Sequence, residues 1–248
     1  MNRYEALQFL GACLSPAMPD TGTAMPIADI IAGNKVDWPE VIALADNHYV
    51  LPLMHYMLQY KGLTDLLPKE VGDTLAELYR LNQSRSTQLR EQLVEVIRQL
   101  NKVGVTPLLL KGAVALMGDL YPDPGCRMMG DLDLLLPEHG LQVGEQALKA
   151  IRYQPMGRPK QDHHLPCLEH PERIGRLELH WEIARPRHAK LLRGANMYEA
   201  SKHVESDGLH YKMGTRNHMA MHNIIHHQFL DTRYRNRTFH LYQVYDLV

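Results

Sequence analysis

The spacing of apolar residues separates a helical first part of the chain from a mixed second part. Between Pro68 and Val103, apolar residues recur mostly at steps of three and four, with Glu, Arg, Gln and Lys between them. This is the period of an α-helix with one buried face. The pattern predicts a long amphipathic helix, either continuous or broken near Asn82-Gln-Ser, within a helical N-terminal region of residues 1–104.

The pattern changes after residue 104. Short apolar runs bounded by turn residues predict strands, and the stretches between them have helical character. Strand, helix, strand, helix, strand predicts a mixed core over residues 105–212. The expected strands are 105–110, 132–136 and 176–182, and the expected helices are 113–120 and 138–153.

The tail of the chain returns to a helical pattern. We expect helices from Arg216 to Leu230 and from Phe239 onward, which together form a C-terminal helical region of residues 213–248. The last pattern stops at Val248 without a cap or a breaker. We therefore expect this region to be truncated.

Composition excludes several classes of protein. The chain has 248 residues and a formal net charge of -1, so its overall charge favours neither nucleic acid nor an anionic membrane. Cys13, Cys126 and Cys167 show no CxxC spacing, which argues against a disulfide framework or a zinc knuckle. There is no signal-peptide pattern and no apolar run of the ~18 residues that span a bilayer. These features predict a soluble, cytoplasmic protein.

Three acidic residues have the pattern of a metal site. In Gly130-Asp-Leu-Asp-Leu, Asp131 and Asp133 project from the same face of a strand, and their repulsion is relieved by a cation such as Mg²⁺. Glu178 has the same apolar-acid-apolar setting, and the three carboxylates could hold two metal ions. The alternatives are a structural Asp-Leu-Asp and a pairing of Glu178 with Arg176.

Candidate phosphate ligands precede these acids. Lys111-Gly112 lies at a strand-to-helix turn, which can present backbone N–H groups and an ammonium to a triphosphate. Arg127 lies four residues before the Asp-Leu-Asp motif and can reach the same phosphates through its forked donors.

Histidines suggest a rival site, since twelve of the fifteen follow residue 160. His218, His222 and His226 are spaced by four residues and share a helical face, with His227 alongside. Two histidines four residues apart on a helix can bind zinc, although only the distant Asp231 offers a further ligand. A polar interhelical face, or a contact with a nucleotide or acceptor, is the alternative.

His180 follows Glu178 by two residues and therefore faces the same way on a strand. It is expected either to hydrogen-bond a metal-binding carboxylate or to lie half-buried beside Trp181. No role is predicted for His163 and His164.

Four segments resemble a known family. Leu110-Lys-Gly-Ala-Val-Ala-Leu, Leu120-Tyr-Pro-Asp-Pro-Gly-Cys-Arg, Gly130-Asp-Leu-Asp-Leu-Leu-Leu and Leu177-Glu-Leu-His-Trp are similar to the uncharacterised bacterial nucleotidyltransferase family (NTP_transf_5). That family is a branch of the DNA polymerase beta-like nucleotidyltransferase superfamily. The resemblance covers about residues 105–182 well and the tail more weakly.

The resemblance implies an α+β fold, in which a small mixed β-sheet nucleotidyltransferase core with helices on one side is flanked by N- and C-terminal helical regions. It implies that Asp131 and Asp133 bind metal, with Glu178 as the third acid. The expected activity is the Mg²⁺- or Mn²⁺-dependent transfer of a nucleoside monophosphate from an NTP, ATP by preference, to an acceptor hydroxyl with release of pyrophosphate.

The partners and two other functions stay open. The acceptor is a small molecule, an RNA or a protein, no membrane is involved, and the N-terminal region can shape an acceptor pocket or dock a partner protein. The first alternative function is a catalytically weak nucleotide-binding or antitoxin-like regulatory module. The second is a histidine-based metallohydrolase.

Overall fold

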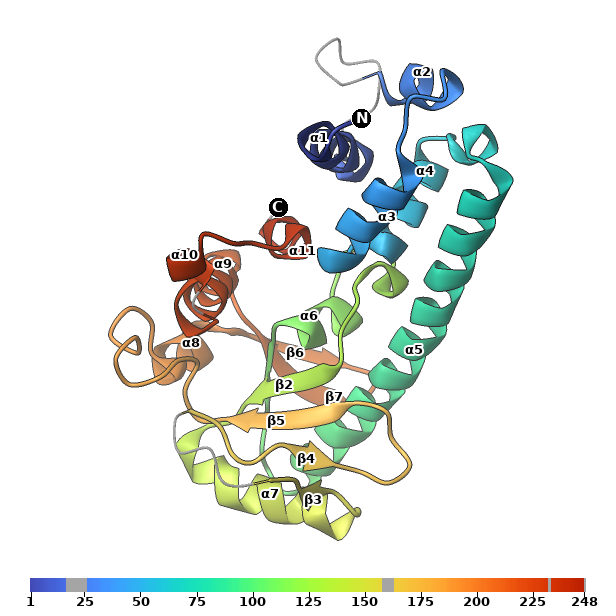
Figure 1. Cartoon of the computed structure of the whole chain (residues 1–248). Coiled ribbons are helices and arrows are strands. Elements are labelled where there is room, and N and C mark those ends of the chain that lie inside the picture. The colour runs from blue at the N-terminus through green and yellow to red at the C-terminus, as the bar shows by residue number, and fades with distance from the viewer. Residues whose placement is uncertain (17–25, 158–162, 232, 248) are drawn as a thin grey trace. The chain divides into compact units, whose positions relative to one another are not determined.

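The computed structural model describes residues 1–16, 26–157, 163–231 and 233–247, which form two compact units (Figure 1). A helical unit comprises Met1–Ser86, Tyr121–Met128 and His240–Tyr242, and a sheet unit comprises Thr87–Leu120, Met129–Phe239 and Gln243–Val248. Val248, where the sequence pattern stops, lies outside the described residues. The domain boundaries expected after residues 104 and 212 stay predictions.

The helical unit begins with capped, amphipathic helices. The side chain of Asn2 accepts from the backbone of Glu5 and the Glu5 carboxylate accepts from the backbone of Asn2, a reciprocal cap that satisfies two helix-terminal N–H groups. Phe9 packs edge-on against Trp38, with ring centroids 6.0 Å apart. The helices of this unit are α1 (Arg3–Leu14), α2 (Ile27–Ala32), α3 (Trp38–Asn47), α4 (Leu51–Tyr60), η1 (Thr64–Leu66) and η2 (Pro124–Cys126).

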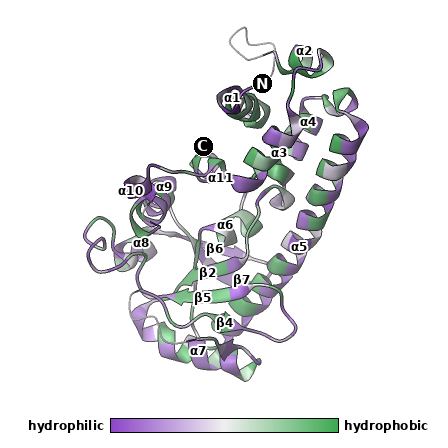
Figure 2. Cartoon of the chain, viewed as in Figure 1, coloured by the Kyte–Doolittle hydropathy of each residue, from purple (hydrophilic) through white to green (hydrophobic). Residues whose placement is uncertain are grey.

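Helix α5 (Lys69–Lys102) contributes residues to both units and is continuous. Its alternating polar and apolar positions are visible in Figure 2. Of the two alternatives, the continuous helix is confirmed and the break near Asn82 is not found, because Asn82 is a satisfied polar residue on the buried side of the helix. Its amide donates to the carbonyls of Gly125 at 2.6 Å and Arg127 at 3.3 Å, so the helix loses nothing by continuing through it.

The sheet has seven strands in the order β3-β4-β5-β2-β1-β7-β6. The β2–β5 and β1–β7 pairs are parallel, and the other neighbours are antiparallel. The predicted mixed sheet is therefore confirmed. The strands are β1 (Leu108–Leu110), β2 (Asp131–Leu135), β3 (Gln154–Pro155), β4 (Leu168–Glu169), β5 (Arg176–His180), β6 (Lys202–Ser206) and β7 (Leu209–Met213).

Four of these strands were not predicted. Strands β3 and β4 have two residues each, too few to give a periodic signal. Strands β6 and β7 form a hairpin whose turn residues, Asp207 and Gly208, have φ of 52° and 71°. Positive φ at both central positions is the type I′ turn that Asp-Gly favours, so the sequence did carry a signal for this hairpin.

The two faces of the sheet carry different packing. Leu132 and Leu134 of β2 are fully buried with apolar residues of α5, including Leu93. On the opposite face, Leu135 packs with Met197 of α8 and Ile225 of η4, so helical residues cover more than the one side implied by the resemblance. The helices of this unit are α6 (Gly112–Met117), η3 (Glu138–Gly140), α7 (Leu141–Ala150), α8 (Gly194–Ala200), α9 (Arg216–Ile224), η4 (Ile225–Leu230) and α10 (Arg233–Asn236), with α11 (Leu241–Tyr245) shared.

The predicted C-terminal helix changes character along its length. It begins at Arg216 after the cap residue Thr215, whose hydroxyl accepts from the backbone of His218 at 3.3 Å. From Ile225 to Leu230 it continues as a π-helix, η4. Among the described residues, none of the helices combines the length and apolar character needed to cross a lipid bilayer.

Candidate active site

Parallel pairing of β2 and β5 brings the predicted acids together. Asp133 lies directly opposite Glu178, and Asp131 lies opposite Arg176. Successive residues of a strand face opposite sides, so Asp131 and Asp133 face away from Leu132 and Leu134, which pack on α5. The acids of two separate sequence motifs thus meet on one face of the sheet.

Asp133 is the most firmly held of these acids. It is 4% exposed, and its Oδ1 accepts from Nζ of Lys111 at 2.7 Å and lies 2.9 Å from Nε2 of His180. Burial raises the pKa of the Asp133 carboxyl, but the attraction of the Lys111 ammonium and the bond from His180 outweigh burial and hold the pKa well below its usual range. Asp133 is therefore ionised at neutral pH.

The two bases beside Asp133 differ in charge: Lys111 is an ammonium and His180 is neutral. Burial lowers the pKa of Lys111, but Asp133 more than compensates, so the pKa is raised and the ammonium persists. Burial lowers the pKa of His180 despite the bond to Asp133. A carboxylate only accepts hydrogen bonds, so the neutral ring must carry its hydrogen on Nε2. The expected contact of His180 with a carboxylate of the site is present.

Asp131 and Glu178 carry less compensated charge. Partial burial, then repulsion by Asp133 and Glu178, raises the pKa of Asp131. Oε2 of Glu178 lies 3.6 Å from Nε2 of His180, beyond a good hydrogen bond. Arg176 pairs with Glu169 at 2.9 Å, so the alternative pairing of Glu178 with Arg176 does not form.

Carboxylate oxygens make up most of the donor set, which suits a divalent cation. Asp133, Glu178 and His180 offer ligand atoms that all lie within 4.8 Å of one another, and Asp131 adds a carboxylate at the exposed end of β2. The repulsion that raises the Asp131 pKa is the interaction that such a cation relieves.

The turn after β1 combines backbone strain with close packing. Lys111 has φ 47° and ψ -126°, a conformation that favours glycine and costs other residues about 1–3 kcal/mol. Gly112 is buried, and a Cβ there would lie 3.0 Å from Sδ of Met129. The turn thus aims the Lys111 ammonium at Asp133, and Met129 packs closely against Gly112.

Arg127 belongs to the helical unit. Its guanidinium lies 4.0 Å from the ring centroid of Tyr242, and Nη1 donates to the carbonyl of Met128 at 2.6 Å. Its predicted contact with phosphate stays a prediction.

Two histidines without a predicted role lie beside the acids. Nε2 of His164 is 4.0 Å from Oε2 of Glu178, and His163 packs on His164 and His180, with centroids 4.8 and 5.6 Å apart. Burial, then repulsion by His180, lowers the pKa of His163 to about 3. His164 forms a β-bridge with His180, a pairing between distant positions that the local sequence does not signal.

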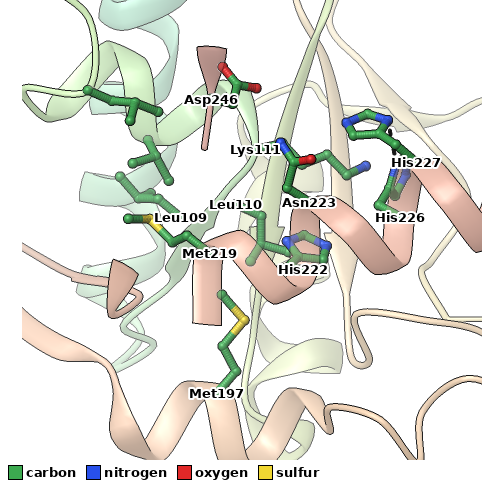
Figure 3. A pocket seen from close by; sticks show the side chains of 12 residues that line it. Leu109, Leu110, Lys111, Met197, Met219, His222, Asn223, His226, His227 and Asp246 are labelled. Atoms are coloured by element: carbon green, nitrogen blue, oxygen red, sulfur yellow. Dashed lines mark hydrogen bonds between the residues drawn. The ribbon is translucent and has the colours of Figure 1, made fainter. Parts of the chain in front are cut away.

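A pocket adjoins this site along β1 and the C-terminal helix (Figure 3). Lys111 lines it together with five residues of α9 and η4. Burial, then repulsion by Lys111, lowers the pKa values of His222, to about 3, and of His226. The wall thus presents the neutral imidazoles of His222 and His226 beside the Lys111 ammonium. Its lining residues are Leu109, Leu110, Lys111, Val114, Leu120, Met197, Met219, His222, Asn223, His226, His227 and Asp246.

Comparisons with known proteins identify the family of the chain. A family model described as an uncharacterised nucleotidyltransferase matches residues 34–248. Among solved structures, the chain is similar to an antigenic nucleotidyltransferase-like protein from Paracoccidioides brasiliensis, with 14% identity, a TM-score of 0.44, and coverage of 65% of this chain and 74% of that one. A comparison with curated proteins finds no match. The family match extends over the whole seven-stranded sheet.

Proposed function

The chain belongs to the family of uncharacterised nucleotidyltransferases, and we propose that it is a metal-dependent enzyme of this kind. It takes an NTP, ATP by preference, and moves the nucleoside monophosphate to an acceptor hydroxyl with release of pyrophosphate. The observation that carries the proposal is the register of β2 and β5, which pairs Asp133 with Glu178 beside Lys111.

In this proposal Asp131, Asp133 and Glu178 hold Mg²⁺ or Mn²⁺. The donor set supports this assignment, because both ions prefer oxygen ligands and keep positions for phosphate. When bound, the ions supply neutralisation of the charge on the phosphates and on the departing pyrophosphate.

The remaining side chains bind and orient the substrates. Lys111 presents its ammonium to the triphosphate, with Gly112 and Arg127 as the other predicted phosphate ligands. Glu178 orients the acceptor hydroxyl and accepts its proton. A bond forms between the acceptor oxygen and the α-phosphorus, and the bond from that phosphorus to the bridging oxygen of pyrophosphate breaks.

A second candidate is a nucleotide-binding module with little catalysis. The Lys111–Asp133 pair favours it, because the ammonium already occupies Oδ1 of the buried acid at 2.7 Å. If that pair persists with nucleotide bound, Asp133 has less capacity for a metal. Binding of NTP without release of pyrophosphate is the signature of this candidate.

The acceptor and the location are parts of the same proposal. The net charge of -1 favours a small molecule or a protein over a long RNA as acceptor, and the helical unit offers a surface for a partner protein. Cys13, Cys126 and Cys167 are all free, which supports the reducing cytoplasm as the site of action.

The proposal is tested with the four labelled NTPs, cell lysate as the source of acceptors, and Mg²⁺ or Mn²⁺. We expect the wild type to transfer label from one NTP and release pyrophosphate, and Asp131→Asn to lower this at least about a hundredfold. Asp131 lies at an exposed strand end, so this variant keeps its fold. Glu169→Gln on the neighbouring strand β4 is the matched control and is expected to retain transfer.

Two outcomes would overturn the proposal. One is transfer by Asp131→Asn at the wild-type rate. The other is transfer that survives complete chelation of divalent ions. Magnesium-dependent NTP binding without pyrophosphate release by any acceptor pool would instead select the second candidate.

A further inference from the structure

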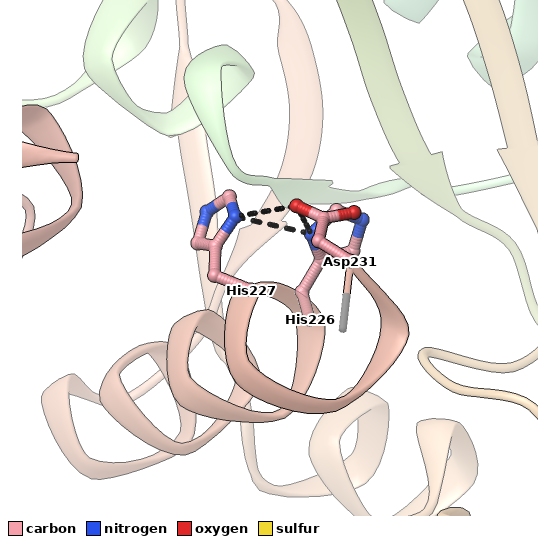
Figure 4. A group of neighbouring side chains, drawn as sticks. All are labelled: His226, His227 and Asp231. Atoms are coloured by element: carbon pink, nitrogen blue, oxygen red, sulfur yellow. Dashed lines mark hydrogen bonds and ion pairs between the residues drawn. The ribbon is translucent and has the colours of Figure 1, made fainter. Parts of the chain in front are cut away.

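A second group of metal-ligand side chains lies on η4 and on the residue that follows it, outside the strands that carry the three acids. His226, His227 and Asp231 place one ligand atom each within 4.8 Å of the others (Figure 4). These residues come from a single turn of helix, and the proposed nucleotidyltransferase chemistry uses none of them.

The π-helical turn is what brings Asp231 to both histidines. The backbone N–H of Asp231 donates to the carbonyl of His226 at 3.0 Å, a bond from i+5 to i. The wider turn sets Oδ2 of Asp231 at 3.0 Å from Nδ1 of His227 and 3.7 Å from Nδ1 of His226. Single π turns recur at functional sites in helices.

The three separations have the size of the edges of a coordination tetrahedron. Nδ1 of His226 and Nδ1 of His227 are 3.4 Å apart. This distance and the two distances to Oδ2 of Asp231 are the three separations between the ligand atoms. Zinc bonds of ~2.0–2.2 Å in tetrahedral geometry separate neighbouring ligand atoms by roughly 3.3–3.6 Å. Small side-chain shifts would make all three separations equal.

From this geometry we propose that His226, His227 and Asp231 bind Zn²⁺, as a site separate from the magnesium site of the strands. Two imidazole nitrogens and one carboxylate oxygen form a three-ligand set of the kind that zinc sites with an open fourth position use. Mg²⁺ prefers an all-oxygen shell and binds such a set poorly.

The surroundings allow access to the site. The side chains of His226 and His227 are 18% and 10% exposed, and that of Asp231 is 36% exposed, so an ion enters past the carboxylate. Both histidines also line the pocket that Lys111 shares. The fourth position of the metal is therefore available to water or to an oxygen atom of a molecule in that pocket.

Arg233 opposes binding and provides a specific test. Its Nε lies 3.7 Å from Oδ2 of Asp231, beyond hydrogen-bond distance. A positive charge this close to the carboxylate repels a second cation. Replacing it with a neutral side chain therefore has an effect that a purely structural histidine cluster would not show.

The experiment measures Zn²⁺ binding to the full chain by calorimetry in excess Mg²⁺, with Co²⁺ as a spectroscopic probe of tetrahedral geometry. We expect one Zn²⁺ per chain and the visible absorption of tetrahedral Co²⁺. His226→Gln/His227→Gln should weaken binding at least about a hundredfold, and Asp231→Asn about tenfold. Arg233→Gln should tighten it about fivefold.

The matched control is another pair of histidines beside an acid. His203 and His210 lie on the β6–β7 hairpin with ring centroids 5.6 Å apart, and Nδ1 of His210 is 4.0 Å from Glu205. Among the described residues, these three are not one of the groups whose ligand atoms all lie within 4.8 Å of one another. His203→Gln/His210→Gln should bind Zn²⁺ as the wild type does.

Three results would overturn the zinc proposal: no Zn²⁺ binding by the folded wild type, equal loss of binding in the control pair, or unchanged affinity in Arg233→Gln. Should the double histidine variant fail to fold, the Asp231 and Arg233 variants still decide the matter. Asp131→Asn is expected to keep Zn²⁺ binding, so failure of the zinc site and failure of nucleotidyl transfer are separate outcomes.

Discussion

The acids of β2 and β5 and the histidine cluster of η4 are built in opposite ways. Asp133 and His180 meet from positions 47 residues apart, and a Lys111 ammonium already compensates the buried charge. His226, His227 and Asp231 lie within one helical turn, where Nδ1 of His227 is hydrogen-bonded to Oδ2 of Asp231 at 3.0 Å and Nε of Arg233 forms a longer ion pair with the same oxygen at 3.7 Å. The site assembled by strand pairing thus holds its counter-charge in a close hydrogen bond, whereas the local cluster has a cation beyond hydrogen-bond distance.

The largest change in stability should come from removing the negative charge of Asp133. Asp133→Asn leaves the Lys111 ammonium without its partner, and breaking a buried pair on one side costs about 3–5 kcal/mol. We expect a loss of about 3 kcal/mol in the free energy of unfolding, measured by urea denaturation. Asp73→Asn, which breaks the exposed Lys69–Asp73 pair, should leave the unfolding midpoint unchanged. Equal effects of the two variants would show that Asp133 is not held as described.

A smaller difference in stability, between two variants of Lys111, should measure the strain of its backbone apart from the loss of its charge. Lys111→Ala and Lys111→Gly both leave Asp133 without its ammonium, but only glycine accepts φ 47° without strain. The glycine variant should therefore be more stable than the alanine variant by about 1–2 kcal/mol. Urea denaturation of both variants measures this difference, and a more stable alanine variant would contradict it.

The buried His222 should make the stability of the protein depend on pH. The pKa of His222 is about 3 in the folded chain, against 6.5 for an ordinary histidine. Between these values the unfolded chain binds the extra proton, so stability is lost as the pH falls. When the pH falls from about 7.5 to 5.5, we expect the free energy of unfolding of His222→Gln to drop by about 1 kcal/mol less than that of the wild type. The exposed His203→Gln should follow the wild type, and identical curves for all three proteins would contradict the assignment.

The smallest effect uses Cys167 as a reporter of the acids. Burial, then the charges of Glu178 and Asp131, raise the pKa of its thiol to about 11. A divalent ion on those acids should lower this pKa and speed thiol labelling about twofold to fivefold. Buried Cys13 and Cys126, with pKa values raised to about 12, should stay unlabelled. The rate of Cys167 labelling should depend less on Mg²⁺ in Asp131→Asn than in the wild type. An equal dependence in the two proteins would show that Asp131 is not a metal ligand.

The same contrast explains what the sequence could predict. The two-residue period of a strand places Asp131 and Asp133 on one face wherever the strand lies, and the apolar-acid-apolar pattern does the same for Glu178. The family resemblance then implied that Glu178 is the third acid of the same metal site. The contact of His164 with Glu178 depends on a long-range bridge, which no local pattern specifies.

The histidine cluster was harder to predict because its helix changes type. An α-helical period groups His218, His222 and His226, and it led to a zinc pair of His222 and His226. In the structure, the ring centroids of His222 and His226 are 6.1 Å apart, and the π turn brings Asp231 close to both His226 and His227. Such a turn depends on tertiary packing, and the sequence period does not reveal it.

The unpredicted β6–β7 hairpin has a consequence for the solubility of shortened forms of this protein. Strand β7 pairs with β1, and the hairpin covers what would otherwise be the open edge of a strand made of three leucines. A bare apolar edge is a template for intermolecular pairing and aggregation. A fragment ending before residue 202 would expose that edge, and one ending at residue 212 would remove the last residue of β7. Fragments intended for biophysical work should therefore extend beyond Met213.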